Sequence, residues 1–550
     1  MAERRNRATA VIAASFSPSA DRRSILDRAH RGDIEGALGH VRAHDTVPRG
    51  SWRRRVATLL AIMGPGVVVM VADNDAGGLS VYAQAGQDSM SLIWLLLLLA
   101  PVLYVIQEMA ARLGAVTGAG HARLIFERFG RRWGYFALGD FLVLNLLTII
   151  TEFIGVALAL GYFGVNRYWA VPFAGLALVV VTGIGSFRRW ELTMFSLVGL
   201  SLVAVPLAVF SGLQHPTTQY VSSAVSTGSL NGGIVLLVVA MIGTTVAPWQ
   251  LFLQQSNVVD KRITARWLPY ERIDLAVGAV LFTIGALAVF VASAVALGGS
   301  SGHSLFIDAS SVADGLRARI GWWAGALFAT ALLNGSVLGA AAVTLSTSYA
   351  LGDVSGVKHS LHRRWRDAPI FHGSFGFCLL VAAVIVLIPH APLGVVTVGV
   401  QVLAGVLVPS ATVFLLLLCN DRAVLGPWTN PRWLNVVAVF VVGILIEMSA
   451  LLTLTTLFPG LHVAVAAVAL TMVWAAGLSA FWFAQARTKK PVPFEGTPWE
   501  LATWTMPRLE SLPPPAPSQS RTAGLVVLRV YLVVAGVLVA ARIAQAIVGG

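Results

Sequence analysis

Residues 64–79 read GPGVVVMVADNDAGGL, an apolar run interrupted by two aspartates and two glycines where a membrane helix should continue. A carboxylate near the middle of a membrane costs about 2.5–3.5 kcal/mol on insertion scales, so Asp73 and Asp75 require a partner or a water-filled cavity. Gly77 and Gly78 permit an unwound backbone whose carbonyl groups turn inward. The stretch therefore predicts a broken helix that lines an ion site.

A second stretch, residues 243–250, reads GTTVAPWQ and interrupts an apolar segment in the same way. Pro248 has no N–H group and clashes with the preceding turn, which frees carbonyl groups around Thr244. Two broken helices, each the first of five, indicate an inverted-repeat transporter with a site near the membrane midplane. Half-helix ends and free carbonyl groups favour a cation there. The alternative is that glycine and proline merely kink two membrane helices, which leaves the two aspartates unexplained.

The composition of the whole chain supports a polytopic membrane protein. Of 550 residues, 56% are hydrophobic and 12% are charged, about half the charged fraction of an ordinary soluble protein. Cys378 and Cys419 both lie in apolar runs, so a disulfide-bonded secreted scaffold is excluded. We find no phosphate-binding glycine loop, zinc-protease helix or nucleophile elbow, so we expect neither an enzyme nor a bound cofactor.

We expect an all-α chain in which twelve apolar segments span the membrane. Their predicted ranges are 57–84, 90–114, 133–163, 168–185, 190–213, 232–256, 274–298, 322–350, 371–388, 393–419, 434–457 and 462–484. A thirteenth segment, 523–547, contains two arginines and either spans or lies in the interface as an amphipathic helix.

These ranges predict six regions along the chain. Residues 1–56 form a cytosolic N-terminal region, in which Asp21–His44 is expected to be a short helix within a solvated tail. Helices 1–5 (57–213) form the first repeat and helices 6–10 (232–419) the second, followed by two appended helices (434–484), a proline-rich cytosolic linker (485–522) and the C-terminal segment (523–550).

The basic residues of the loops predict the orientation. With the N-terminus inside, the inner loops hold seventeen arginines and lysines and the outer loops three. The net charge of +13 is therefore a topology signal, and nucleic-acid binding is not needed to explain it. We expect a multi-pass protein of the cell membrane with a cytoplasmic N-terminus, whose partners are the lipid bilayer and an ion. Its oligomeric state stays open.

Three further polar residues in apolar runs have structural explanations. Glu108 precedes Arg112 by four residues, which predicts a helical ion pair. Asn334 is expected to bond between helices, and Glu447 to serve packing or an oligomer contact.

At the two breaks the sequence resembles the natural-resistance-associated macrophage protein (NRAMP) family of divalent metal transporters. The similarity covers residues 56–420, with looser agreement to 484, and includes the stretches ARLGAVTG at 111–118 and EFIG at 152–155. The resemblance implies the LeuT-type fold, in which two sets of five helices form inverted repeats and further helices are appended. It also implies that Asp75 takes the place of the metal-binding aspartate.

The sequence departs from the family at both motifs. The family's Asp-Pro-Gly-Asn is replaced here by Asp75-Ala76-Gly77-Gly78, and its Met-Pro-His by Ala247-Pro248-Trp249. A second histidine of the sixth helix is replaced by Gln254. The soft thioether and both imidazoles are thus lost.

The remaining ligand candidates are all oxygen donors. Asp75 is the principal one, and the others are Asp73, the amide of Asn74, the carbonyl groups of Thr244 and Ala247, and the amide of Gln401. Magnesium prefers oxygen and keeps several of its waters, and alanine in place of methionine leaves room for them. The pattern is similar to the NRAMP-related magnesium transporter branch, and manganese, which is similarly hard, should pass too.

We predict transport that is largely uncoupled from protons, because the sixth helix carries no histidine. Glu152 and Trp249 are the candidates for carrying a proton or for contacting the metal ligands from behind. A proton-coupled manganese or iron importer remains an alternative, as does a membrane metal sensor or scaffold that does not transport. An amino-acid transporter of similar plan is disfavoured, because Asp73 and Asp75 would repel its carboxylate-bearing substrate.

Overall fold

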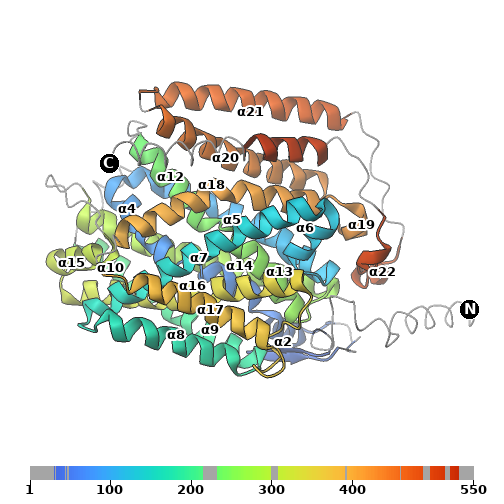
Figure 1. Ribbon diagram of the computed structural model, residues 1–550, viewed down its shortest axis with the longest axis horizontal. Helices are drawn as coiled ribbons and strands as arrows, with labels where there is room; N and C mark the ends of the chain where they lie inside the picture. The colour runs from blue at the N-terminus through green and yellow to red at the C-terminus, as the bar shows by residue number, and fades with distance from the viewer. Residues whose placement is uncertain are drawn as a thin grey trace, which may run out of the picture.

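The computed structural model describes residues 30, 32–43, 45, 49–214, 232–298, 308–389, 393–458, 460–486, 496–513 and 521–531. In this part of the chain the secondary structure is helical apart from one short hairpin (Figure 1). The longer helices lie alongside one another, and α20 and α21 lie at one edge of the bundle.

Each of the twelve predicted segments is occupied by one or two helices, except the first (57–84), which holds three. Their bounds are α2 Trp52–Ile62, α3 Pro65–Val71, α4 Ala76–Asp88, α5 Ile93–Thr117, α7 Arg131–Tyr162, α8 Arg167–Gly183, α9 Phe187–Ser201, α10 Ala204–Gln214, α12 Gly232–Thr245, α13 Pro248–Asp260, α14 Leu268–Leu297, α16 Trp322–Ser355, α17 Pro369–Val386, α18 Leu393–Cys419, α20 Arg432–Leu457 and α21 Val463–Ala486. Shorter helices between them are α6 His121–Phe129, α15 Ala309–Arg319, α19 Arg422–Leu425 and α22 Pro498–Ala502.

Within the described ranges, nine spans are long and apolar enough to cross a membrane, and the bent pair α2–α3 makes a tenth. The other two predicted segments correspond to the shorter apolar helices Arg167–Gly183 and Val463–Ser479.

Both predicted helix breaks are confirmed. α3 ends at Val71 and α4 begins at Ala76, so the aspartates lie in the interruption. α12 ends at Thr245, and α13 begins with Pro248 as its first residue. An additional bend of 52° separates α2 from α3, where Gly64 has a φ of 155° that glycine alone adopts readily.

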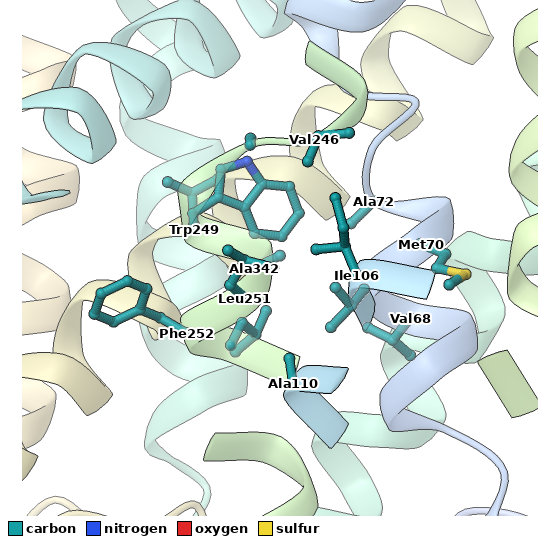
Figure 2. Close-up of a cluster of buried hydrophobic side chains, with 14 of the residues drawn as sticks. Val68, Met70, Ala72, Ile106, Ala110, Val246, Trp249, Leu251, Phe252 and Ala342 are labelled. Carbon is teal, nitrogen blue, oxygen red and sulfur yellow. The ribbon is translucent and has the colours of Figure 1, made fainter. Parts of the chain in front are cut away.

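The broken helices lie in the middle of the bundle. α14 packs along α3 and α4, α12 packs along α18, and α13 packs against α5 and α16. Figure 2 shows apolar side chains from both broken helices meeting near the breaks, among them Ala72, Val246 and Trp249. Close packing of this kind fixes the breaks relative to each other.

The N-terminal region contains a β-hairpin in place of the expected helix. β1 (Ile34–Gly36) pairs antiparallel with β2 (Gly39–Val41), with Ile34 opposite Val41. Both side chains are buried in the core, and the glycines are required because Ala61 approaches Gly36 and Gly39 closely. The expectation of a solvated helix was therefore wrong for residues 32–43, while residues 21–29, 31 and 44 lie outside the described part. The short alternating pattern flanked by two glycines is typical of a hairpin.

The segment after α21 packs back onto the bundle where it is described. The Met506 amide donates to the Val116 carbonyl (3.1 Å), and the Trp428 indole donates to the Leu501 carbonyl (3.1 Å). Residues 521–531 are helical, while the rest of the predicted segment 523–547 lies outside the described residues.

The remaining polar predictions fit the structure. Glu108 pairs with Arg112 at 3.4 Å and also with Arg272 at 2.8 Å. Asn334 donates from α16 to the carbonyl of Leu197 (3.0 Å) in α9, as expected of a bond between helices. Glu447 accepts a hydrogen bond from Thr471 of α21, so its role within the described chain is packing.

Candidate ion site

Asp75 begins α4 and is held by the backbone. It is the N-cap residue, and its Oδ1 accepts a hydrogen bond of 2.6 Å from the Gly78 amide, as aspartates commonly do at this position. Its side chain is also hydrogen-bonded to that of Glu152 in α7, whose Oε2 accepts from the Ala76 amide at 3.1 Å. Two carboxyl groups in contact must share a proton or a cation, since both cannot carry charge side by side without one.

Asp73 is buried with no exposed surface and retains free bonding capacity. Its Oδ1 accepts a hydrogen bond from the side chain of Gln250 of α13, and the Gln250 side-chain oxygen Oε1 accepts one from Gln107 Nε2 of α5 at 3.0 Å. Its Oδ2 has no hydrogen-bond partner among the described residues. A buried anionic oxygen without a partner is costly, so this atom is available to a cation.

The glycines after Asp75 bring a third helix and the second break close to the first. The Gln401 side chain of α18 lies directly against Gly77, in space that a side chain at that position would fill. A Cβ atom at Gly78 would lie 2.5 Å from the Asp73 carbonyl oxygen and 3.1 Å from the Thr244 hydroxyl oxygen. The packing around Gly78 therefore leaves no space for a larger side chain at this position.

Thr244 and Gln401 both direct unsatisfied polar atoms into this region. The Thr244 hydroxyl oxygen and the Gln401 amide nitrogen are buried and have no hydrogen-bond partner in the described chain. The Thr244 carbonyl group lacks its usual helical donor, because the residue four positions later is Pro248. The structure thus brings together four of the predicted residues: Asp73, Asp75, Thr244 and Gln401.

The other predicted residues are placed differently. Asn74 turns toward α14, where its amide nitrogen donates to the Phe282 carbonyl at 3.1 Å and its side-chain oxygen has no partner. The Ala247 carbonyl accepts from the Gln250 amide at 3.2 Å. The Trp249 indole lies in the apolar cluster of Figure 2, and its carbonyl group accepts from Ser346 at 2.8 Å.

Gln250 and Gln107 are site residues that the sequence analysis missed. Both are fully buried, and together they orient Asp73. Two features of the sequence could have indicated them. Gln250 is the last residue of the stretch 243–250, and Gln107 is a polar amide inside the apolar segment 90–114. Tyr82 of α4 adds a bond of 2.9 Å to Thr245, which ties the two broken helices together.

The assembled groups are carboxylates, amides, a hydroxyl and freed carbonyls, which are hard oxygen donors suited to magnesium, calcium or manganese. Among the described residues, no cluster of three or more histidine, cysteine, aspartate or glutamate side chains has metal-binding geometry.

Comparison with known proteins gives a consistent result. The family model for natural resistance-associated macrophage protein-like proteins matches residues 66–455. A divalent metal cation transporter, MntH, of Levilactobacillus brevis is 27% identical over 78% of this chain and 95% of its own length. A second MntH, from Verminephrobacter eiseniae, is 29% identical over 74% and 93%. The fold matches the manganese transporter of Eremococcus coleocola with a TM-score of 0.61 and 20% identity, over 82% of this chain and 98% of that one.

Proposed function

Because the chain belongs to the natural resistance-associated macrophage protein (Nramp) family of divalent metal cation transporters, we propose that it imports magnesium, with manganese also accepted. The metal ion is the substrate of this transport, and the chain is a transporter rather than an enzyme.

The observation that carries the magnesium proposal is the unpartnered Oδ2 of Asp73 beside the second break. Asp73 and Asp75 supply the charge, and Thr244 supplies a neutral oxygen. Gln401 would supply a second one after its amide group rotates, because its nitrogen now faces Gly77. Ala247 has a short side chain at the second break, which suits an ion that keeps part of its water, as magnesium does. None of Asp73, Asp75, Thr244 and Gln401 carries a thioether or an imidazole, the soft or borderline groups that would favour a transition metal.

Transport in this proposal is driven by the membrane potential. A divalent cation gains about 4.6 kcal/mol from 100 mV, twice the value for a single charge. His121 of α6, outside the membrane-spanning segments, contacts the middle of α13 through a hydrogen bond of 2.9 Å to Gln255, whereas His30 and His362 contact its last residue, Asp260. Burial lowers the pKa of His121 to about 4, so it carries no proton near neutral pH. The basic inner loops support a cytoplasmic N-terminus and a location in the cell membrane.

A second candidate function, proton-coupled manganese or iron import, is favoured by the hydrogen bond between Glu152 and Asp75. One proton must lie between the two carboxyl groups when no metal is bound. If the arriving metal displaced that proton to the inner side, the two fluxes would be coupled.

Uptake by Asp73→Asn in liposomes tests the site. We expect magnesium uptake to fall at least about tenfold, the loss that corresponds to about 1.4 kcal/mol of binding. The matched control is Glu447→Gln, which neutralises a buried carboxyl group in α20 that packs against α21. Unchanged uptake in Asp73→Asn would remove Asp73 from the site. A wild-type chain that binds magnesium without any flux would instead indicate a sensor.

A further inference from the structure

One face of α13 carries polar side chains along its whole length. Gln250, Gln254, Asn257 and Lys261 follow one another at spacings of three or four residues, which places them on one side of the helix. All four are buried. Gln250 contacts Asp73, and Lys261 at the other end contacts Glu191 of α9. This polar face therefore leads from the ion site toward the end of the bundle where the hairpin lies.

Two carboxyl groups of α14 lie beside this polar face. Glu271 and Asp274 are one helical turn apart, and neither has exposed surface. Asp274 caps α3 by accepting from the amides of Gly66 (2.7 Å) and Val67 (3.3 Å). Glu271 Oε1 accepts from the Gln254 amide at 2.9 Å.

Glu271 and Gln254 each keep one atom unsatisfied. In the described chain, Glu271 Oε2 and the Gln254 side-chain oxygen are buried without a hydrogen-bond partner. When Glu271 is ionised both atoms are acceptors and cannot satisfy each other, so a proton, another donor or a cation is needed. Asn257, one turn farther along α13, is also buried with both side-chain polar atoms unpartnered.

The nearby ammonium group of Lys261 already has three hydrogen-bond acceptors. The Lys261 ammonium group donates to Glu191 at 2.6 Å and to the carbonyl groups of Ile62 (2.8 Å) and Met63 (2.7 Å), which uses its three protons. No lysine, arginine or histidine of the described residues forms an ion pair with Glu271 or Asp274 within 4.0 Å. The single charge of Lys261 acts on both carboxyl groups but is shared with Glu191, so it cannot compensate all three. One divalent cation would neutralise Glu271 and Asp274.

We propose that Glu271, Asp274 and the Gln254 side-chain oxygen form a second binding station for the transported divalent cation. The station lies along α13, beyond the Asp73–Asp75 site on the side of the hairpin, and the inference rests on the proposed transport function. Three protein oxygens leave the remaining coordination positions to water, which suits an ion that passes while partly hydrated. The neighbouring positive charge of Lys261 weakens binding there, which favours onward release.

The test is the number of Mn²⁺ ions bound by the purified full-length chain in lipid nanodiscs, measured by electron paramagnetic resonance of the free ion. Wild type should bind two Mn²⁺ ions, one tightly at the Asp73–Asp75 site and one more weakly at Glu271. Excess Mg²⁺ should displace both ions. Glu271→Gln should lose the weakly bound Mn²⁺ ion and bind the tightly bound ion with unchanged affinity. The double variant Asp73→Asn/Asp75→Asn should lose the tightly bound Mn²⁺ ion and keep the weakly bound ion at Glu271. Glu447→Gln is the matched control and should bind both.

Two results would overturn the station. If Glu271→Gln binds as many Mn²⁺ ions as wild type, Glu271 is not a ligand, although the Asp73–Asp75 site stands. If Glu271→Gln fails to fold, Gln254→Met removes a neutral oxygen from the same station, and a weakly bound Mn²⁺ ion of unchanged affinity in that variant contradicts the inference. A wild-type chain that binds no Mn²⁺ or Mg²⁺ would refute the proposed function itself.

Discussion

Replacing Lys261 by methionine should strongly destabilise the protein, because its buried partner would keep a charge without compensation. Lys261 and Glu191 have 0% and 1% exposed side chains, and their charged atoms are 2.6 Å apart. Removing one member of a buried ion pair costs about 3–5 kcal/mol. The loss should lie toward the upper end of this range, because Lys261 also binds two carbonyl groups at the bend between α2 and α3.

The same reasoning predicts how a double variant behaves. Lys261→Met/Glu191→Gln removes both charges of the pair, so it should lose less stability than either single variant. Glutamine can still accept the hydrogen bond that the Ala37 amide of the hairpin donates to Glu191 at 2.6 Å. The single and double variants thus form a double-mutant cycle.

Equilibrium unfolding in mixed micelles, followed by tryptophan fluorescence, would measure the free energies. Lys358→Met, which removes an exposed lysine from the loop after α16, is the matched control and should change the free energy of unfolding little. The reasoning is refuted if the losses of the two single variants add up in the double variant, or if Lys261→Met unfolds like the control.

Three further predictions concern the site and its surroundings. Ala247→Met restores a thioether at the second break and should shift competition between manganese and magnesium toward manganese by about tenfold, measured by uptake of one ion against a series of the other. Gly78→Ala should lower magnesium affinity in a binding titration, because its Cβ atom would lie 2.5 Å from the Asp73 carbonyl oxygen. Burial alone would lower the pKa of His359, but its hydrogen bond to Asp353 (3.1 Å) and the carboxylate charge outweigh burial and raise it to about 9. Stability from this pair should be complete below pH 6.5 and lost as the pH rises through about 9, and His359→Asn should flatten that dependence in thermal unfolding at several pH values.

The broken helices could be predicted from the sequence because their causes are local. Pro248 has no backbone N–H group to donate, whatever surrounds it. The consecutive glycines after Asp73 and Asp75, together with the two charges, are incompatible with an ordinary membrane helix. The length and apolar character of the other segments likewise predicted the helices. The bend at Gly64 was missed, because a positive φ is a property of the packed backbone.

The partners of the ion site could not be predicted, because they come from segments distant in the chain. Gln107 and Gln250 meet through the packing of α5 on α13, which no local pattern specifies. Glu271 was also missed for a definite reason: the sixth and seventh helices are separated by a basic stretch, and the predicted segment began at residue 274. In the structure α14 begins at Leu268, so a carboxyl group assigned to a loop is buried.

Lys261 illustrates the same limit. It was counted among the loop charges that orient the chain, whereas its ammonium group is fully buried and binds Glu191. In the sequence, a lysine near a helix end looks the same whether it lies in an exposed loop or in a buried ion pair. Only the tertiary contact distinguishes the two cases.

The most direct test of the proposed function is a simultaneous recording of magnesium and proton movement into liposomes that hold the purified chain. An inside-negative potential is imposed, with one fluorescent probe for Mg²⁺ and another for internal pH. The account predicts magnesium influx that increases with the potential and no acidification beyond that of empty liposomes. Manganese that enters together with protons while magnesium is excluded would contradict it.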